Sequence, residues 1–118
     1  MKNVAAVRER FESDPERVQL GSLASALARL RSFATDDRLE KAARLALEES
    51  RLMAEWMKSE SDGDTHRLLA TIRAQLVDWE ADWPTLWASS TRRVSTAQTV
   101  EQWSMELLDI SGLIPRGA

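Results

Sequence analysis

The sequence predicts an all-α protein: a compact antiparallel bundle of about four main helices with an additional short N-terminal helix. Alanine, leucine, glutamate and arginine, which all favour helices, dominate the 118 residues, and there are only 4 glycines and 3 prolines. Apolar residues recur every three or four positions, the period of a helix, and no alternating strand pattern stands out. We expect residues 1–114 to form a single domain, followed by a frayed tail at 115–118.

The first two helices are expected on either side of "SDPER". Val4, Val7 and Phe11 form a short apolar stripe before it. Asp14 is expected as the N-cap and Pro15 as the first residue of a helix over about 15–33. Its flank carries small residues, which predict a close crossing with another helix. The inner face of this helix is expected to consist of Leu20, Leu23, Leu27, Leu30 and Ala34, and the small residues are Gly21, Ser22, Ser25, Ala26 and Ala28.

A third helix is expected over about 36–60, capped by Thr35 or Asp36. Its charged face carries opposite charges four residues apart, which is typical of a solvated surface. To one side of the inner face, Leu45, Leu52 and Trp56 predict a second apolar surface. That surface is covered either by the N-terminal segment or by another subunit. The inner face is expected to contain Leu39, Ala42, Ala43, Ala46, Ser50, Met53 and Met57.

A loop at 59–64 precedes a helix that begins at Asp64 or Thr65 and continues into "DWEADWPTLW" at 78–87. Proline lacks the N–H that a helix interior requires, so Pro84 predicts either a kink or a short break with a new turn. The inner face of this helix is expected to contain Leu68, Ile72, Leu76, Trp79, Trp83, Leu86 and Trp87.

A polar hinge or helix–helix turn is expected at 88–96, before a last helix over about 95–111 that ends at Gly112. Its inner stripe is expected to be Val100, Trp103, Leu107 and Ile110, with Met105 and Leu108 pointing away.

The tryptophans at 79, 83 and 87 continue an aliphatic stripe, so we interpret them as core residues. Trp87 follows the proline and is expected to be partly exposed, where it would anchor a partner. As an alternative, Trp83, Trp87 and Trp103 would wall a pocket for a small molecule.

Composition disfavours most chemistry. The chain has no cysteine, which excludes disulfides and thiolate sites, and His66 is its only histidine. No nucleophile elbow, phosphate-binding loop or calcium loop occurs. The net charge of −3 and the absence of a long apolar run argue against nucleic acid and membrane insertion. We therefore predict a non-enzymatic, cytoplasmic protein with no catalytic residue, cofactor or metal. Two groups of basic residues near helix–helix turns are interpreted as solvated charge rather than a site for a phosphate or an acidic partner. They are Arg29, Arg31, Arg38, Lys41 and Arg44 at the second turn, and Arg92 and Arg93 at the last turn.

Two stretches, "LGSLASALARLRSF" with "EESRLMAEW" and "LVDWEADWPTLWASSTRR" with "QWSMELLDISGLI", resemble small uncharacterised helical proteins of cyanobacteria. The resemblance extends from Leu20 to Ile114 and implies a cyanobacterial cytoplasmic protein with no assigned activity. Pro84 departs from the family pattern. The matching positions are Leu20, Gly21, Leu23, Ala24, Glu49, Ser50, Glu55, Trp56, Trp79, Trp83, Trp87, Trp103, Ser111 and Gly112.

Surplus apolar residues without a catalytic constellation predict a protein–protein interaction or oligomerisation module. The partner is an unknown protein or a second copy in a homodimer. The alternative is a small-molecule-binding bundle with the tryptophan-lined pocket. The candidate interface residues are Leu45, Leu52, Trp56, Trp87, Met105 and Leu108.

Overall fold

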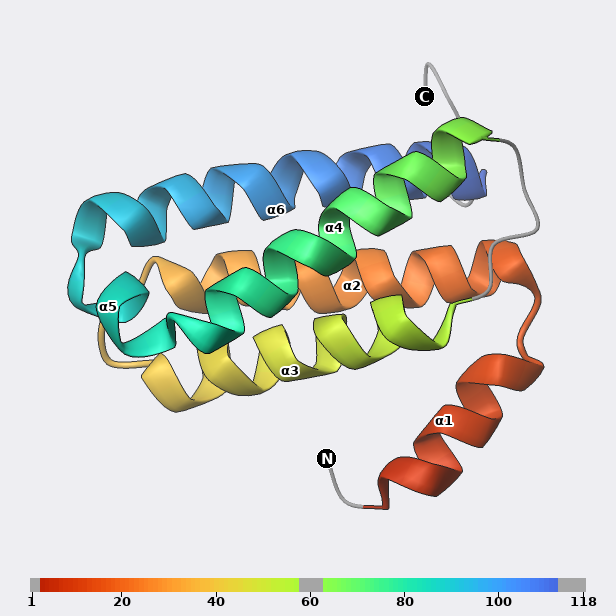
Figure 1. Ribbon diagram of the computed structural model, residues 1–118, viewed down its shortest axis with the longest axis horizontal. Helices are drawn as coiled ribbons and strands as arrows, with labels where there is room; N and C mark the ends of the chain where they lie inside the picture. Colours follow the sequence, from red (N-terminus) through yellow and green to blue (C-terminus); the bar gives the residue numbers. More distant parts are fainter. Residues whose placement is uncertain (1–2, 58–62, 113–118) are drawn as a thin grey trace.

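The computed structural model describes residues 3–57 and 63–112, and this part of the chain forms six helices without a strand (Figure 1). The all-α prediction is therefore confirmed for the described residues. None of their helices is both long enough and apolar enough to cross a membrane. The helices are α1 (Val4–Ser13), α2 (Glu16–Ala34), α3 (Glu40–Trp56), α4 (Gly63–Ala81), α5 (Trp83–Ala88) and α6 (Ser90–Ser111).

Helix α2 lies between α3 and α6 and runs in the direction opposite to both of them (Figure 1). Helix α4 packs against α3 but crosses the other helices obliquely, and the short α5 leads from it to α6. Helix α1 contacts the end of α3. The predicted short N-terminal helix is α1, whereas the oblique α4 and the short α5 depart from a simple antiparallel bundle of about four main helices.

The apolar stripe predicted for α2 is buried along its whole length, as expected for a helix covered on two sides. The stripes of α3, α4 and α6 meet it in one continuous core. The fully buried side chains that fill the centre of this core are Leu23, Leu27, Leu30, Leu47, Ile72, Leu76, Leu86, Val100 and Leu107.

Helices α2 and α6 pack closely against each other. Of the small residues predicted to make a close crossing, Gly21 and Ala26 are buried, Ser22 and Ala28 are partly buried and Ser25 is exposed. Ser104 is buried on α6. The Ser104 hydroxyl donates a hydrogen bond of 2.9 Å to the Ala24 carbonyl. A side chain as short as serine reaches the backbone of the opposite helix only where the two helices lie close together, so small residues set the spacing of this pair.

Helices α2 and α3 both begin later than predicted. Asp14 does not cap α2: its backbone N–H donates to Phe11 at the end of α1, and Pro15 takes the N-cap position in an extended conformation. Neither predicted cap of α3 serves it. The Thr35 hydroxyl donates to Ser32 within α2, and α3 begins only at Glu40.

Asp36, the other predicted cap of α3, is engaged by a neighbour in the turn. Its carboxylate accepts hydrogen bonds from the backbone N–H and the guanidinium of Arg38. The side-chain hydrogen bond from Arg38 lowers the pKa of Asp36 below its ordinary value. The turn therefore uses its polar side chains locally, and Leu39, predicted as core, is exposed before the helix starts.

Pro84 produces a break rather than a kink. Helix α4 ends at Ala81, Asp82 connects the two segments, and α5 starts at Trp83 with the proline in its first turn. In this position the missing N–H of proline leaves no helical hydrogen bond unmade.

The polar hinge or turn predicted at 88–96 is much shorter than expected, because α5 ends at Ala88 and α6 begins at Ser90. The Ser89 hydroxyl accepts a hydrogen bond of 3.2 Å from the Arg92 N–H, so one capping residue replaces the hinge. At the other end Gly112 caps α6 with a left-handed φ of 72°, as predicted. Ile110, predicted to face inward, is 45% exposed. The predicted loop at 59–64 and the predicted tail at 115–118 lie mostly or wholly outside the described residues.

We expect Ser104→Leu to destabilise the protein by about 1–3 kcal/mol, because the added volume forces α2 and α6 apart. Ser104→Ala should cost about 1 kcal/mol through loss of the hydrogen bond to Ala24. Urea unfolding followed by circular dichroism measures both effects. The matched control is Ser25→Leu on the exposed side of α2, and an equal loss of stability in that variant would contradict the assignment.

Candidate functional site

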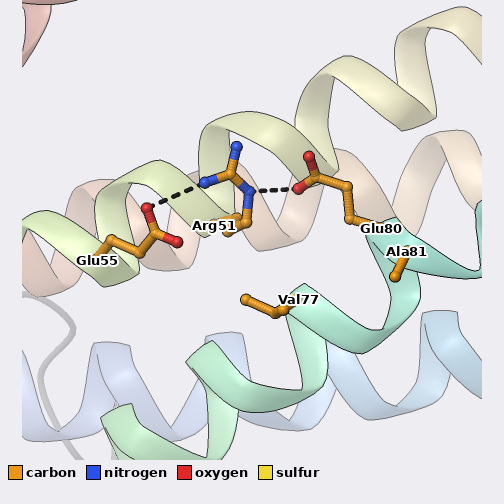
Figure 2. A pocket seen from close by; sticks show the side chains of 5 residues that line it. All are labelled: Arg51, Glu55, Val77, Glu80 and Ala81. Carbon is orange, nitrogen blue, oxygen red and sulfur yellow. Dashed lines mark hydrogen bonds and ion pairs between the residues drawn. The ribbon is translucent and has the colours of Figure 1, made fainter.

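Two adjoining depressions lie where α3 meets α4 and α5, and both include Glu80. We call them together the α3–α4 groove. The first has a volume of about 410 Å³ (Figure 2), and the second, toward α5, has a volume of about 350 Å³. The first is lined by Arg51, Glu55, Val77, Glu80 and Ala81 and the second by Arg44, Leu45, Glu48, Glu80, Trp83 and Pro84.

The helical period explains why these residues meet. The charged residues of α3 that line the groove follow one another at spacings of four, three and four, so they share one face of the helix. Val77, Ala81 and Pro84 follow at spacings of four and three and bring apolar surface to the opposite wall. The groove thus combines a charged wall from α3 with a largely apolar wall from α4 and α5.

Arg51 connects the two walls of the first depression (Figure 2). Its Nη1 donates to the Glu55 carboxylate at 3.0 Å, and its Nε donates to the Glu80 carboxylate on α4. The hydrogen bond to Glu80 is the main cause that raises the pKa of Arg51, which keeps the guanidinium charged at every accessible pH. The pair therefore joins α3 to α4 and stabilises the groove as it stands.

Apolar side chains stand at the rim of the groove on both sides. Leu45 on α3 is 49% exposed and Val77 on α4 is 43% exposed. Below them the Trp83 ring is buried and stacks on Trp87, with ring centroids 5.3 Å apart. The Trp83 indole N–H has no hydrogen-bond partner among the described residues. The rim is thus available to a partner, whereas the indole belongs to the packing beneath it.

The predicted tryptophan-walled pocket is not assembled. The rings form two separate pairs, because Trp103 packs against Trp79 at 5.6 Å and Trp83 packs against Trp87. Arg93 covers Trp87, with its guanidinium carbon 4.9 Å from the ring centroid and Nη1 donating to the Trp87 carbonyl. Of the three residues predicted to form the pocket, Trp83 alone lines one of the depressions described here.

Trp56 is buried, with 6% of its surface exposed, which corrects its assignment to the candidate interface. Phe11 of α1 covers it at a ring distance of 5.8 Å, so the N-terminal segment supplies the cover that the sequence left open. Leu52, Trp87 and Leu108 are partly buried against the core.

The two candidate interface residues that remain well exposed are Leu45 and Met105, and they lie apart. Leu45 belongs to α3 and Met105 to α6, on opposite sides of α2 (Figure 1). The predicted interface is therefore not a single surface.

The arginines singled out in the sequence are largely paired. Arg29 bonds Glu49 at 3.0 Å, Arg38 bonds Asp36 at 3.0 Å, and Arg92 bonds Asp82 at 2.8 Å. Arg31 lies 3.9 Å from Glu101. Within residues 3–57 and 63–112, no three histidine or carboxylate side chains lie close enough together to hold a metal ion.

The sequence missed the α4 side of the groove. Val77 and Ala81 fall outside the inner stripe of their helix, and a single valine on a polar face carries no signal by itself. The spacing of Val77, Ala81 and Pro84, four and three residues apart, indicates that they share one face of a helix.

Phe11→Ala should lower the free energy of unfolding by about 3 kcal/mol, because it removes the ring that covers Trp56. Trp56 should also become more accessible to acrylamide, as measured by fluorescence quenching. In a Trp56→Phe background the extra quenching should disappear. The control Val4→Ala alters an exposed residue of α1 and should change neither quantity; native-like quenching in Phe11→Ala would refute the covering role.

Glu80→Gln should destabilise the protein by about 1 kcal/mol, the upper end for a partly exposed ion pair, because Arg51 loses its partner on α4. Thermal unfolding at low salt measures the effect, and 1 M salt should reduce it. Glu48→Gln changes the same chemistry in the same groove without an observed ion pair. Equal losses in the two variants would show that the bridge contributes nothing.

Comparison of the chain with protein-family models, curated proteins and solved structures finds no match.

Proposed function

We propose that this protein is a non-enzymatic interaction module that binds an amphipathic helix of a partner protein in the α3–α4 groove. One observation carries the proposal: Leu45 and Val77 stand exposed on the two walls of a groove whose walls are joined by the Arg51–Glu80 pair. Exposed apolar side chains around a formed groove are typical of interaction sites.

The dimensions of the groove suit a short helical segment. From Arg44 to Glu55 the α3 wall covers eleven residue steps, or about 17 Å, which corresponds to roughly three helical turns. The apolar positions on the other wall repeat at helical spacing, so a partner stripe at i, i+4 and i+7 would contact them in turn.

The charges of the groove favour a weakly basic partner. Three carboxylates line it against two guanidinium groups, and Arg51 is already engaged by Glu55 and Glu80. A lysine or arginine beside the apolar stripe of the partner would complement the remaining negative charge. Such rim charges contribute orientation and association rate more than affinity.

The ion pair with Glu80 raises the pKa of Arg51, so in the groove this guanidinium links α3 to α4. The tryptophans are engaged in packing, so they give little support to the alternative of a small-molecule pocket. A cytoplasmic location and a cyanobacterial source remain predictions from the sequence.

Leu45→Asp and Val77→Asp should each weaken partner binding at least tenfold, because each places an unpaired carboxylate in the apolar contact. The partner is first identified by affinity capture, and its binding segment is then made as a peptide. Titration of that peptide against native and variant protein measures the affinity.

The matched control is Ile110→Asp, which puts the same charge on an equally exposed apolar residue of α6. It should bind the peptide like the native chain. The proposal is overturned if all three variants capture the same proteins as the native chain, or if no purified peptide binds the groove.

A further inference from the structure

The outward face of α6 carries a second, independent pattern. Its residues follow one another at alternating spacings of three and four, the spacing of a coiled-coil seam. They differ from the residues that α6 buries against α2 and α4, such as Val100, Trp103 and Leu107. We call them the α6 outer stripe: Thr91, Val94, Gln98, Glu101 and Met105, with the partly buried Leu108 at its end.

We propose that the α6 outer stripe pairs antiparallel with the same stripe of a second copy of this chain. Val94 is 49% exposed and Met105 is 65% exposed, although both are large and apolar. From Val94 to Val100 the helix carries no charged side chain. Helix α6 also lies at an edge of the molecule, where its outer side is not covered by α2 (Figure 1).

The register follows from the positions. In an antiparallel pair centred between residues 99 and 100, Met105 of one copy lies opposite Val94 of the other. A hollow of about 380 Å³ lies at this place, lined by Ser90, Thr91, Val94, Ser95 and Gln98. A methionine side chain is long and flexible enough to fill such an irregular space. Each copy thus offers both the side chain and the hollow that receives it.

The remaining positions of the same register are also complementary. Gln98 of one copy lies opposite Glu101 of the other, so the amide can donate to the carboxylate. A parallel pair would instead place Glu101 against Glu101. Charge therefore selects the antiparallel arrangement.

The length of α6 sets the strength of the dimer. Its 22 residues extend over about 33 Å, and one helix against another buries less than the ~1,600 Å² of a standard interface. We therefore expect a reversible dimer that forms only at high protein concentration. Helices α6 and α3 lie on opposite sides of α2, so the dimer leaves both α3–α4 grooves open and does not depend on their function.

Sedimentation equilibrium of the full chain over a wide concentration range tests the dimer. The native chain should shift from monomer to dimer, and Val94→Lys and Met105→Lys should each weaken association at least tenfold. Ile110→Lys, which introduces the same charge on α6 away from the stripe, should associate like the native chain. Monomer at every concentration, or equal weakening by all three variants, overturns the proposal.

The register has a separate test, because the chain lacks cysteine. Val94→Cys and Met105→Cys are made as single variants and oxidised alone and as an equal mixture. In the proposed register identical cysteines are offset by eleven residues, or about 16 Å along the axis, beyond the reach of a disulfide. The mixture should give a cross-linked heterodimer in large excess over either homodimer. Homodimers that form as readily as the heterodimer, or no cross-link at all, overturn the register.

Discussion

The structure depends on the burial of helix α2 between α3 and α6. Every residue of the predicted α2 stripe is buried. Four leucines of this helix belong to the core: Leu20, Leu23, Leu27 and Leu30. Two small residues, Ala24 of α2 and Ser104 of α6, meet where these helices lie close together. The Ser104–Ala24 hydrogen bond is a consequence of that closeness.

The central position of α2 determines which surfaces remain for partners. Helices α3 and α6 are separated by α2, so their exposed apolar residues cannot combine into one patch. Helix α4 crosses obliquely, and the α3–α4 groove lies where it meets α3. The Arg51–Glu80 ion pair joins the two helices there. The outer stripe of α6 faces away from this groove. A helical domain of this size can in this way offer two unrelated surfaces.

Much of the site lay beyond sequence reasoning. Leu45 and Met105 were recognised as surplus apolar residues, but whether they share a surface depends on the order of the helices in space. Val77 and Glu80 join the site only because α4 crosses α3 at that level. Trp56 was an open case, since its periodicity allows either an internal cover or a partner, and only the position of Phe11 decides between them.

The sequence by itself determined the helical class, the inner stripe of α2, most of the inner faces of the later helices and the glycine end of α6. These follow from local periodicity and backbone preference, which act within a few residues. The tertiary structure alone decided the helix starts at Glu16, Glu40 and Ser90, the break at Asp82 and the oblique course of α4. Those features depend on competition between local hydrogen bonds and contacts far apart in the chain. The side chains of Thr35 and Asp36 show why, because each bonds a residue within three positions in the chain instead of capping α3.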